Sequence, residues 1–569
     1  MRITDTSDLW WKNAVIYSLD VETYQDGNGD GIGDFSGLAR RIDYLAELGV
    51  TCLWLMPFYP SPDKDDGYDI TDFYTVDPRL GTLGDFVEVT RTAHDRGMKV
   101  IVDLVLNHTS DEHPWFTESR KSTDNPYRDW YVWRDTEPPD TSDKVVFPDA
   151  EDSIWEKDEA TGEWYLHHFY RFQPDLNIAN PSVREEIGRI IGFWTQLGVD
   201  GFRVDAVPFI LDTTGYTRAE KRDLGDPMDV LRETCALLRR RTGDGILLGE
   251  VNVPYKDQYG FFGGEHGDGL SLQFDFIGMQ AVYLAMARHD SRPIVKALRQ
   301  RAKYPLARET QWANFLRNHD ELTLDKLTES ERQEVFDAFG PEKEMQVFDR
   351  GLKRRLPPML GGDPRRIRMA YSLLFALPGT PSLFYGEEIG MGEDLAEEGR
   401  MAVRTPMQWT SEESAGLSRR GPDALVAPLA GGGYGPDHVN VAHQRSDSGS
   451  LYSFIRSLIY LHRRHPELGW APVEILDVGA GAGAGAGKNG VLALAARGEE
   501  AAVVTVHNLG AEGCTVTLSL DDVEPGSRLI DLWDQRALDD DPTTPIEVQL
   551  DGYGYRWLRV QSEADTRLY

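Results

Sequence analysis

Eight short apolar runs alternate with longer amphipathic stretches, and this alternation constrains the fold more than any other feature of the chain. The runs cover residues 14–17, 51–56, 100–105, 201–205, 246–250, 272–276, 312–316 and 382–385. Between them lie amphipathic stretches with the length of helices, for example at 35–48, 83–96 and 182–197. Strands that alternate with helices form parallel sheets, and eight such units predict an α/β fold with a closed (β/α)8 TIM barrel rather than an open sheet.

Two regions depart from this alternation. Between the third and fourth runs lies a long segment, residues 106–200, which is rich in Trp, Tyr and Pro. Structureless loops of that length are uncommon, so we expect a small inserted domain after the third strand. After about residue 475, apolar residues recur at every second position, which predicts a C-terminal all-β sandwich with a flexible Gly-Ala loop at 479–487. The expected boundaries are 1–107 and 178–475 for the barrel, 108–177 for the inserted domain and 476–569 for the sandwich.

The composition excludes several kinds of partner. The chain has 60 Lys and Arg against 94 Asp and Glu, a formal net charge of -34, and no basic run that stands clear of neighbouring acids. Its mean hydropathy is -0.44, and no apolar run approaches the roughly 18 residues of a membrane-spanning helix. The first residues lack the basic and apolar regions of a secretion signal. We therefore expect a cytoplasmic protein that binds neither nucleic acid nor membranes.

Polar residues cluster where the expected strands end. They are Asp103, Asn107, His108, Arg203, Asp205, Glu250, Asn318, His319 and Asp320. Catalytic groups of a barrel stand at the carboxyl ends of its strands, where side chains from different strands meet. Cleavage of a glycosidic bond needs one carboxylate as nucleophile and a protonated one as acid. Any single one of these residues could instead form an ion pair at a strand end, but the set together favours a glycosidase.

Four short segments carry a resemblance to a known family. Residues 103–108, 201–206, 249–250 and 318–320 resemble, in this order, the motifs of the α-amylase superfamily of retaining glycoside hydrolases. Residues 173–177 are similar to a further motif of its α-glucosidase-like branch. The resemblance implies Asp205 as nucleophile, Glu250 as general acid and base, and Asp320 as the residue that stabilises the transition state. Members that have lost catalysis lose these carboxylates, so their presence here argues for an enzyme and against a binding or scaffold subunit.

The resemblance also implies which residues bind the sugar. At the subsite where the bond is cleaved, these are His108, Arg203 and His319. The segment after the second strand contributes Asp66, Tyr68 and Asp69, with the tyrosine under the sugar ring and an aspartate on its far hydroxyls. In exo-acting members an arginine that matches Arg404 pairs with this aspartate, which implies small substrates. From the inserted domain we expect Phe147, Phe172 and Gln173 near the pocket.

Within the superfamily, residues 315–324, 386–392 and 404–409 are most similar to the trehalose synthases, which interconvert maltose and trehalose. Glu321, in the first of these segments, is also placed among the sugar-binding residues. Phe209 and Asp325 replace an expected Tyr and Glu, and the segment 249–254 also differs from the usual pattern. These positions border the acceptor side, so fewer polar contacts there would favour water as acceptor. Two hypotheses stay open: isomerisation by glucosyl transfer, or hydrolysis by an exo-acting α-glucosidase.

Two calcium sites are expected. The loop 26–34 places oxygen donors at alternate positions, as an EF-hand loop does, but Gly37 stands where that loop has its bidentate glutamate. The α-glucosidase-like branch has such a loop as a structural calcium or magnesium site, which implies the ligands Asp26, Asn28, Asp30, Ile32 and Asp34. The resemblance implies a second calcium held by Asn107, Asp175, Phe209, Ile210 and Asp212. The alternative for the first site is a plain Gly/Asp turn, and for the second a hydrogen-bonded junction without metal. The sequence also leaves open an assembly of identical subunits.

Overall fold

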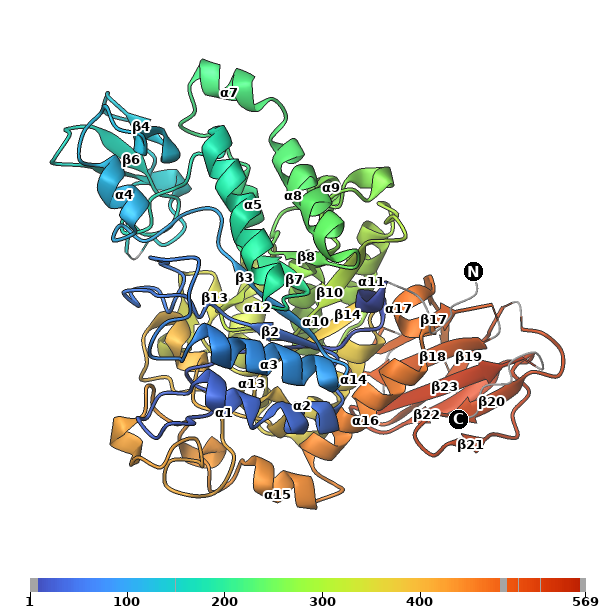
Figure 1. Cartoon of the computed structure of the whole chain (residues 1–569). Helices are drawn as coiled ribbons and strands as arrows, with labels where there is room; N and C mark the ends of the chain where they lie inside the picture. The colour runs from blue at the N-terminus through green and yellow to red at the C-terminus, as the bar shows by residue number, and fades with distance from the viewer. Residues whose placement is uncertain (1–8, 149, 481–488, 500, 522, 563–569) are drawn as a thin grey trace.

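The eight apolar runs form the eight strands of one closed parallel barrel, which confirms the predicted fold class (Figure 1). The computed structural model describes residues 9–562, except for 149, 481–488, 500 and 522. In order around the barrel, the strands are β1 (Ile16–Leu19), β2 (Cys52–Leu55), β3 (Lys99–Leu104), β7 (Gly201–Val204), β8 (Ile246–Gly249), β9 (Leu272–Phe274), β10 (Gln311–Asn314) and β14 (Thr380–Phe384). The barrel closes where β1 pairs with β2 on one side and β14 on the other, in a register that sets Ile16 opposite Cys52 and Ser382.

Helices follow the strands and cover the barrel. They are α1 (Phe35–Ala39), α2 (Ile42–Leu48), α3 (Leu83–Asp95), α5 (Pro181–Gln196), α8 (Pro227–Thr242), α9 (Tyr255–Phe261), α10 (Phe276–Arg288), α11 (Arg292–Arg301), α12 (Glu329–Phe339) and α14 (Pro364–Ala376). Shorter or later helices are α6 (Val207–Ile210), α7 (Arg218–Leu224), α13 (Leu356–Met359), α15 (Val441–Ser446), α16 (Leu451–Arg464) and α17 (Glu467–Trp470).

Local sequence explains how such a helix begins and which face it buries. In α3, the Thr82 side chain accepts a hydrogen bond from the amide of Asp85, and the Asp85 carboxylate accepts one from the amide of Thr82. This capping box satisfies two amides that the helix leaves free. The buried residues recur at helical spacing and face the barrel: Phe86, Val89, Thr90 and Ala93.

The prediction of one helical stretch over 35–48 is wrong in one respect: the structure has two helices there, α1 and α2. At the break, the amide of Arg41 bonds the carbonyl of Leu38, and the amide of Tyr44 bonds the carbonyl of Arg41. These bonds span three residues instead of four, so the backbone tightens and the helix axis is interrupted.

The long segment after β3 folds as an insert that projects from the barrel (Figure 1). It contains α4 (Pro114–Ser119) and a small sheet in which β6 (Trp164–Leu166) lies between β4 (Trp133–Arg134) and β5 (Trp155–Lys157). Isolated bridges pair His108 with Asp175 and Tyr131 with Leu176, so the two ends of the insert are joined beside β3. A second small sheet follows β10 and has the order β11 (Leu322–Thr323), β13 (Gly351–Leu352), β12 (Gln346–Val347).

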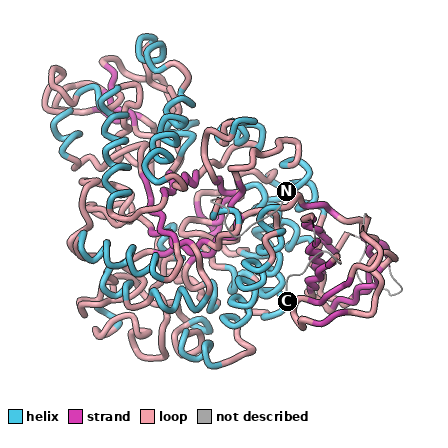
Figure 2. Tube along the Cα trace, turned by 45° about the vertical axis from the view of Figure 1, so that its right-hand side comes forward, coloured by secondary structure: helices cyan, strands magenta, loops and turns pink. Residues whose placement is uncertain are grey.

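The predicted C-terminal β region is confirmed, and Figure 2 shows its strands apart from those of the barrel. One sheet has the order β15 (Val473–Ile475), β17 (Val491–Arg497), β18 (Ala501–Asn508), β23 (Tyr555–Gln561), β20 (Arg528–Asp531), β21 (Arg536–Ala537). The other has the order β16 (Val478–Ala480), β19 (Cys514–Leu518), β22 (Ile546–Leu550). Both sheets contribute to one hydrophobic core, as a sandwich requires. Most of the Gly-Ala run, residues 481–487, lies outside the described residues, and Gly479 and Ala480 belong to β16.

Across the described part of the chain, no helix combines the length and the apolar character needed to cross a membrane.

Candidate active site

A cavity of about 520 Å³ opens where the barrel strands end. Nine of the residues expected from the sequence line it: Tyr68, His108, Phe147, Asp205, Phe209, Glu250, Asp320, Glu321 and Asp325. A volume of this size suits a disaccharide or another small ligand.

The buried guanidinium of Arg203 joins the carboxylates at the centre of the site. Its Nη1 donates to Asp103 Oδ1 and to Asp205 Oδ1, each at 2.6 Å, and its Nη2 donates to Glu250 Oε2 at 2.6 Å. Arg203 and Asp205 are two residues apart at the end of β7, so their side chains leave the same face of the chain. Asp103, on β3, also accepts a hydrogen bond of 2.7 Å from the Trp54 indole. Carboxylates from β3 and from the ends of β7 and β8 therefore all contact the Arg203 guanidinium.

Burial raises the pKa of both reacting carboxyls, and to different values. It raises the pKa of Asp205 to about 6, while the positive charge of Arg203 opposes the shift. Burial raises the pKa of Glu250 to about 7, again against Arg203, and the neighbouring Asp205 charge adds to the rise. Near neutral pH, Asp205 is mostly ionised and Glu250 still carries a proton in much of the population. That combination of a nucleophile and an acid is the one that glycosidic cleavage requires.

The backbone directly after Asp205 adopts a left-handed conformation. Ala206 has φ 46°, which is unfavourable for a residue with a Cβ. The turn brings its amide to 3.4 Å from Glu250 Oε2, the oxygen that Arg203 also contacts. Such strain persists only where the surroundings hold it, and here it fixes the relative positions of the two carboxyls.

Asp320, the third expected carboxylate, is held by cations. Its Oδ1 accepts hydrogen bonds from Arg400 Nη1 at 2.9 Å and from Arg404 Nη2 at 3.2 Å, and its Oδ2 lies 3.2 Å from His319 Nε2. Burial would raise the pKa of Asp320, but His319 and the two guanidinium groups outweigh it and lower the pKa. Asp320 therefore stays ionised and can stabilise positive charge that develops on a bound sugar.

A buried ion pair lies behind Tyr68, on one side of the cavity. Arg404 Nη1 contacts Asp66 Oδ2, and Arg404 Nε donates to the carbonyl of His319 at 2.9 Å. Tyr68 Oη lies 2.8 Å from His319 Nε2, and the two rings are stacked at 5.7 Å. Of these residues only Tyr68 lines the cavity, and the others hold it in place from behind. We call this set, Asp66, Tyr68, Arg203, His319 and Arg404, the closed wall.

His108 offers a free hydrogen-bonding atom to a ligand. The side chain is buried and lines the cavity, yet its Nε2 has no hydrogen-bond partner in the described part of the chain. A buried nitrogen in that state is unfavourable unless a ligand or water satisfies it. Burial also lowers the pKa of His108, so the ring is neutral at pH 7 and can bind a hydroxyl.

Another part of the cavity lining comes mainly from loops, and its residues are half-buried or exposed. Asp325 Oδ1 accepts hydrogen bonds of 3.0 Å from Asn252 Nδ2 and from Gln280 Nε2, and its Oδ2 lies 2.7 Å from Lys326 Nζ. Phe209, which lies on α6, packs on Phe169 with the ring centroids 5.1 Å apart. We call Phe209, Asn252, Glu321, Asp325 and Lys326 the loop wall.

Seven of the expected sugar-binding residues are not part of the cavity lining: Asp66, Arg203, His319 and Arg404 of the closed wall, and Asp69, Phe172 and Gln173. The Asp69 carboxylate accepts hydrogen bonds from Ser61 Oγ and from the amides of Lys64 and Asp65, so it holds the loop that precedes Tyr68. Phe172 stacks on Tyr170 at 5.0 Å. Gln173 Nε2 donates to Asp65 Oδ2 at 2.9 Å, so it supports a wall residue rather than forming the wall itself.

Sequence reasoning missed Asp65 and Arg400. Arg400 Nη2 lies 2.5 Å from Asp65 Oδ1, while its Nη1 binds Asp320. Both residues line the cavity, and the Arg400 guanidinium lies 5.3 Å from the Phe147 ring. Only weak signals were available: Asp65 directly precedes Asp66, and Arg400 lies one turn before Arg404.

The loop at 26–34 turns back on itself around its own side chains. Asp26 accepts hydrogen bonds from the amides of Gly29 and Gly31, and Asp30 accepts one of 2.9 Å from the amide of Ile32. Asp34 accepts one of 2.7 Å from the amide of Gly37 at the start of α1. Carboxylate oxygens keep further lone pairs when they accept such bonds, so the donor set remains compatible with a calcium ion.

At the second expected metal site, the structure places a histidine between the carboxylates. His168 Nδ1 contacts Asp175 Oδ2, and His168 Nε2 lies 3.3 Å from Asp212 Oδ2. Burial alone would lower the pKa of His168, but Asp175 and Asp212 raise it to about 9. Asn107 Nδ2 donates to Asp175 Oδ1 at 3.0 Å, and the Phe209 carbonyl accepts from the amide of Asp212. The imidazolium thus supplies the positive charge that a cation would bring, so a metal ion fits here only if His168 moves.

A barrel with an insert after its third strand, and an arginine that joins three carboxylates at the strand ends, is the arrangement of a glycoside-cleaving enzyme. The alpha amylase catalytic domain matches residues 18–339 and 347–471, and a sucrose hydrolase-like C-terminal domain matches residues 501–559. The chain therefore belongs to the α-amylase family of glycosidases and transglucosylases.

Among relatives, the trehalose synthase of Thermus thermophilus is 42% identical over 95% of this chain, and the chain spans 54% of that protein. The trehalose synthase of Pimelobacter sp. is 36% identical over 98% of this chain and 96% of its own length. The oligo-1,6-glucosidase of Parageobacillus thermoglucosidasius is 31% identical over 82% of this chain and 86% of its own. The α-amylase of H. orenii is similar in structure, with a TM-score of 0.75 and 26% identity over 97% of this chain and 100% of its own.

Proposed function

We propose that this protein is a retaining α-glucosyl-transferring enzyme that acts on small α-glucosides and isomerises maltose and trehalose. The observation that carries the proposal is the contact of Arg203 with Asp205 and Glu250 at the cavity, beside the buried Asp66–Arg404 pair. The site can hold one terminal glucosyl unit with both reacting carboxyls beside it. Trehalose synthases among the relatives support the same substrate class.

The chemistry follows from the roles that the carboxyls can take. Asp205 attacks the anomeric carbon while Glu250 donates its proton to the leaving oxygen, which breaks the glycosidic bond and forms a β-glucosyl ester. Asp320 stabilises the positive charge on the ring in the transition state. Glu250, now ionised, takes a proton from the acceptor hydroxyl, which attacks the ester and frees Asp205. When the acceptor is the glucose just released, the products are isomers with retained α-configuration.

Hydrolysis is the second candidate, and the loop wall favours it. Phe209 offers no hydroxyl to a freed glucose, and the Asp325 carboxylate already has Asn252, Gln280 and Lys326 as partners. A glucose that finds few hydrogen bonds leaves before it is reattached, and water then opens the glucosyl ester. Oligo-1,6-glucosidases are also among the relatives.

Proton NMR of the purified enzyme with maltose separates the two candidates, because the anomeric signals of trehalose, maltose and both glucose anomers can be followed together. Trehalose that forms faster than free glucose is the expected result. Glucose alone, released first as the α anomer, would replace isomerisation by hydrolysis and keep the retaining mechanism. Maltose that stays unchanged would contradict the proposed substrate.

We propose a structural calcium at the loop 26–34, where Asp26, Asn28, Asp30 and Asp34 would give side-chain oxygens and Ile32 its carbonyl, with magnesium as the alternative ion. The oxygen donors at alternate positions support this. For the second site, at Asn107, Asp175 and Asp212, calcium would require displacement of His168. Dialysis against a strong chelator should lower the melting temperature, and added calcium should restore it. A melting temperature that the chelator leaves unchanged would contradict both sites.

We also propose that the protein works in the cytoplasm and binds neither nucleic acid nor membranes, as the net charge of -34 supports.

A further inference from the structure

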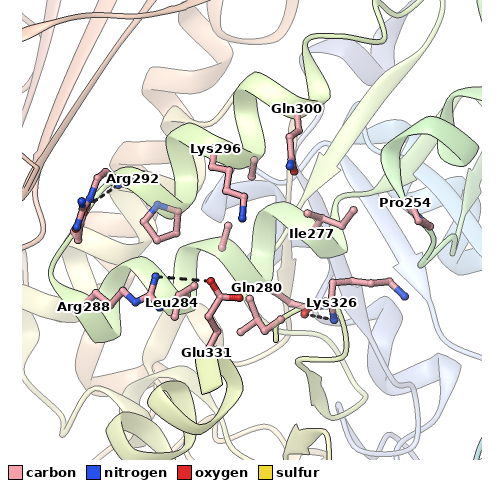
Figure 3. A pocket seen from close by; sticks show the side chains of 15 residues that line it. Pro254, Ile277, Gln280, Leu284, Arg288, Arg292, Lys296, Gln300, Lys326 and Glu331 are labelled. Atoms are coloured by element: carbon pink, nitrogen blue, oxygen red, sulfur yellow. Dashed lines mark hydrogen bonds and ion pairs between the residues drawn. The ribbon is translucent and has the colours of Figure 1, made fainter. Parts of the chain in front are cut away.

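A second pocket lies on the helical layer of the barrel (Figure 3), and it shares one lining residue, Lys326, with the sugar cavity. It has a volume of about 600 Å³, and α10 and α11 form two of its walls. Lys326, Leu327 and Glu331, which lie between β11 and the first turn of α12, form the third. The volume is in the range of pockets that bind small organic molecules.

The two helices present an apolar floor to this pocket. Residues of α10 recur at helical spacing along it, and α11 adds a second stripe, so the floor is continuous: Ile277, Ala281, Leu284, Pro293 and Ala297. All but Ile277 are buried. None of the lining residues is aromatic, so the pocket lacks the flat rings on which sugars stack. An apolar body fits this floor better than a sugar ring.

Cationic side chains outnumber acidic ones among the residues that line the pocket. Four cationic side chains, Arg288, Arg292, Lys296 and Lys326, line it together with two acidic ones, Asp290 and Glu331. Two further acids, Glu334 and Asp325, pair with Arg288 and Lys326 from outside the lining, so the charges of the rim as a whole balance. An anion would therefore be attracted at a cation of the rim that has no acidic partner.

One of these cations is available to a ligand. Arg288 pairs with Glu334 at 2.7 Å, Arg292 pairs with Asp290, and Lys326 pairs with Asp325. Lys296 is exposed, and its side chain makes no ion pair or hydrogen bond with another described residue. Figure 3 shows the Lys296 side chain extending from α11 toward α10, over the floor of the pocket. Its ammonium group therefore stands where an anionic head group would meet it.

A buried glutamine links this pocket to the loop wall of the sugar cavity. Gln280 lines the pocket and is fully buried. Its Nε2 donates to Asp325 Oδ1 at 3.0 Å, and its Oε1 accepts from the amide of Lys326 at 2.9 Å. Lys326 itself lines both the pocket and the sugar cavity. A ligand that orders Lys326 thus acts on the segment that carries Asp325.

We propose that this pocket binds a small organic anion, with an apolar ring or chain on the floor between α10 and α11 and a phosphate, sulfonate or carboxylate at Lys296. The bound anion orders residues 322–328 through Lys326 and Gln280. The pocket is thereby a regulatory site beside the acceptor side of the sugar cavity. This inference does not depend on which sugar reaction the enzyme performs, because ligand binding and ordering are measured without substrate.

The binding test uses fluorescence titration of the full chain with anilinonaphthalene sulfonate as the reporter and phenyl phosphate as the competitor. Lys296→Glu should weaken the competition by phenyl phosphate about tenfold or more, since it replaces an attractive charge by a repulsive one. The matched control is Lys303→Glu, which makes the same charge change just after α11 and outside this pocket. Equal weakening by both variants, or none by Lys296→Glu, would overturn the proposal.

Two further competitors define the ligand. Benzyl alcohol, which has the ring without the charge, and inorganic phosphate, which has the charge without the ring, should each compete at least about tenfold more weakly than phenyl phosphate. Adenosine monophosphate and hydroxybenzoate then distinguish a nucleotide from an aromatic acid as the source of the anion. If benzyl alcohol competes as well as phenyl phosphate, the pocket is an apolar site and the proposal is wrong.

Hydrogen–deuterium exchange tests the link to the sugar cavity. In the wild-type protein, phenyl phosphate should slow exchange in residues 322–328. In Gln280→Met, which keeps the size of the side chain and removes its hydrogen bonds, the anion should still bind but the slowing should be lost. Exchange in this segment that is unchanged by saturating phenyl phosphate in the wild-type protein would overturn the proposed link.

Discussion

The closed wall and the loop wall of the sugar cavity differ in how firmly they are held. In the closed wall, the side chains of Arg404 and Asp66 are 2% and 9% exposed and pair with each other. In the loop wall, Lys326 and Asp325 also pair, but their side chains are 28% and 25% exposed. A buried pair in a low dielectric is screened little by water, whereas a partly exposed pair can rearrange at small cost. In the proposed mechanism, the geometry for bond cleavage is therefore fixed, while the fate of the glucosyl unit depends on the less constrained wall.

Removal of the nucleophile should have the largest effect and should leave both walls in place. Asp205→Ala is expected to lower kcat on maltose by about ten-thousandfold, because the glucosyl ester can no longer form. Arg203 keeps its contacts with Asp103 and Glu250, so the fold should persist. Steady-state kinetics with circular dichroism as a folding control measures this. Activity that survives in a folded variant would show that the nucleophile is another residue.

A change in the closed wall should have the next largest effect. Asp66→Asn removes the charge that faces Arg404, and we expect kcat/KM on maltose to fall about a hundredfold, since the terminal sugar is no longer held in line with Asp205. The matched control is Asp72→Asn, an exposed position in the same segment, which should change kcat/KM by less than about twofold. If the two variants behave alike, the ion pair has no part in catalysis.

The pH profile reports on the carboxyls between the walls. Cleavage needs Asp205 ionised and Glu250 protonated, so kcat/KM should fall as pH drops through the pKa of about 6 and as it rises through the pKa of about 7. Above the higher value, the loss should approach about tenfold per pH unit.

A substrate that needs no acid catalyst tests whether Glu250 causes the fall of kcat/KM at high pH, which we call the alkaline limb. With nitrophenyl α-glucoside, whose leaving group departs as an anion, the Glu250→Ala variant should keep its rate of glucosyl-ester formation as pH rises, measured as the burst of nitrophenol. An alkaline limb that remains in this variant would assign the limb to another group.

Changes in the loop wall should have the smallest effect on turnover and the clearest effect on products. The double variant Phe209→Tyr with Asp325→Glu adds a hydroxyl and a longer carboxylate beside the acceptor, so the ratio of trehalose to free glucose should rise several-fold, about the worth of one hydrogen bond. Phe193→Tyr adds a hydroxyl on α5, outside the cavity lining, and should leave the ratio unchanged. Product ratios from NMR decide this, and a ratio that does not move would place the control of transfer elsewhere.

The barrel was predictable because its pattern is local and repeated. The β3 strand and the helix α3 follow from runs of apolar residues whose period and caps can be counted along the chain. The catalytic carboxyls were predictable for a related reason: Asp205 directly follows β7 and Glu250 directly follows β8, and the ends of barrel strands always meet. The division between α1 and α2 was not predictable, because it depends on a change of hydrogen bonding over one turn.

The sequence by itself determined the barrel, the C-terminal sandwich and the carboxyls at the strand ends, since these depend on periodicity and on short motifs. Only the tertiary structure decided that Arg400 joins Asp320 to Asp65, that Asp69 and Gln173 support the cavity from behind, and that His168 lies between Asp175 and Asp212. These contacts join residues that are distant along the chain, such as Asp65 and Arg400, and their energies come from burial and charge that exist only once the chain has folded.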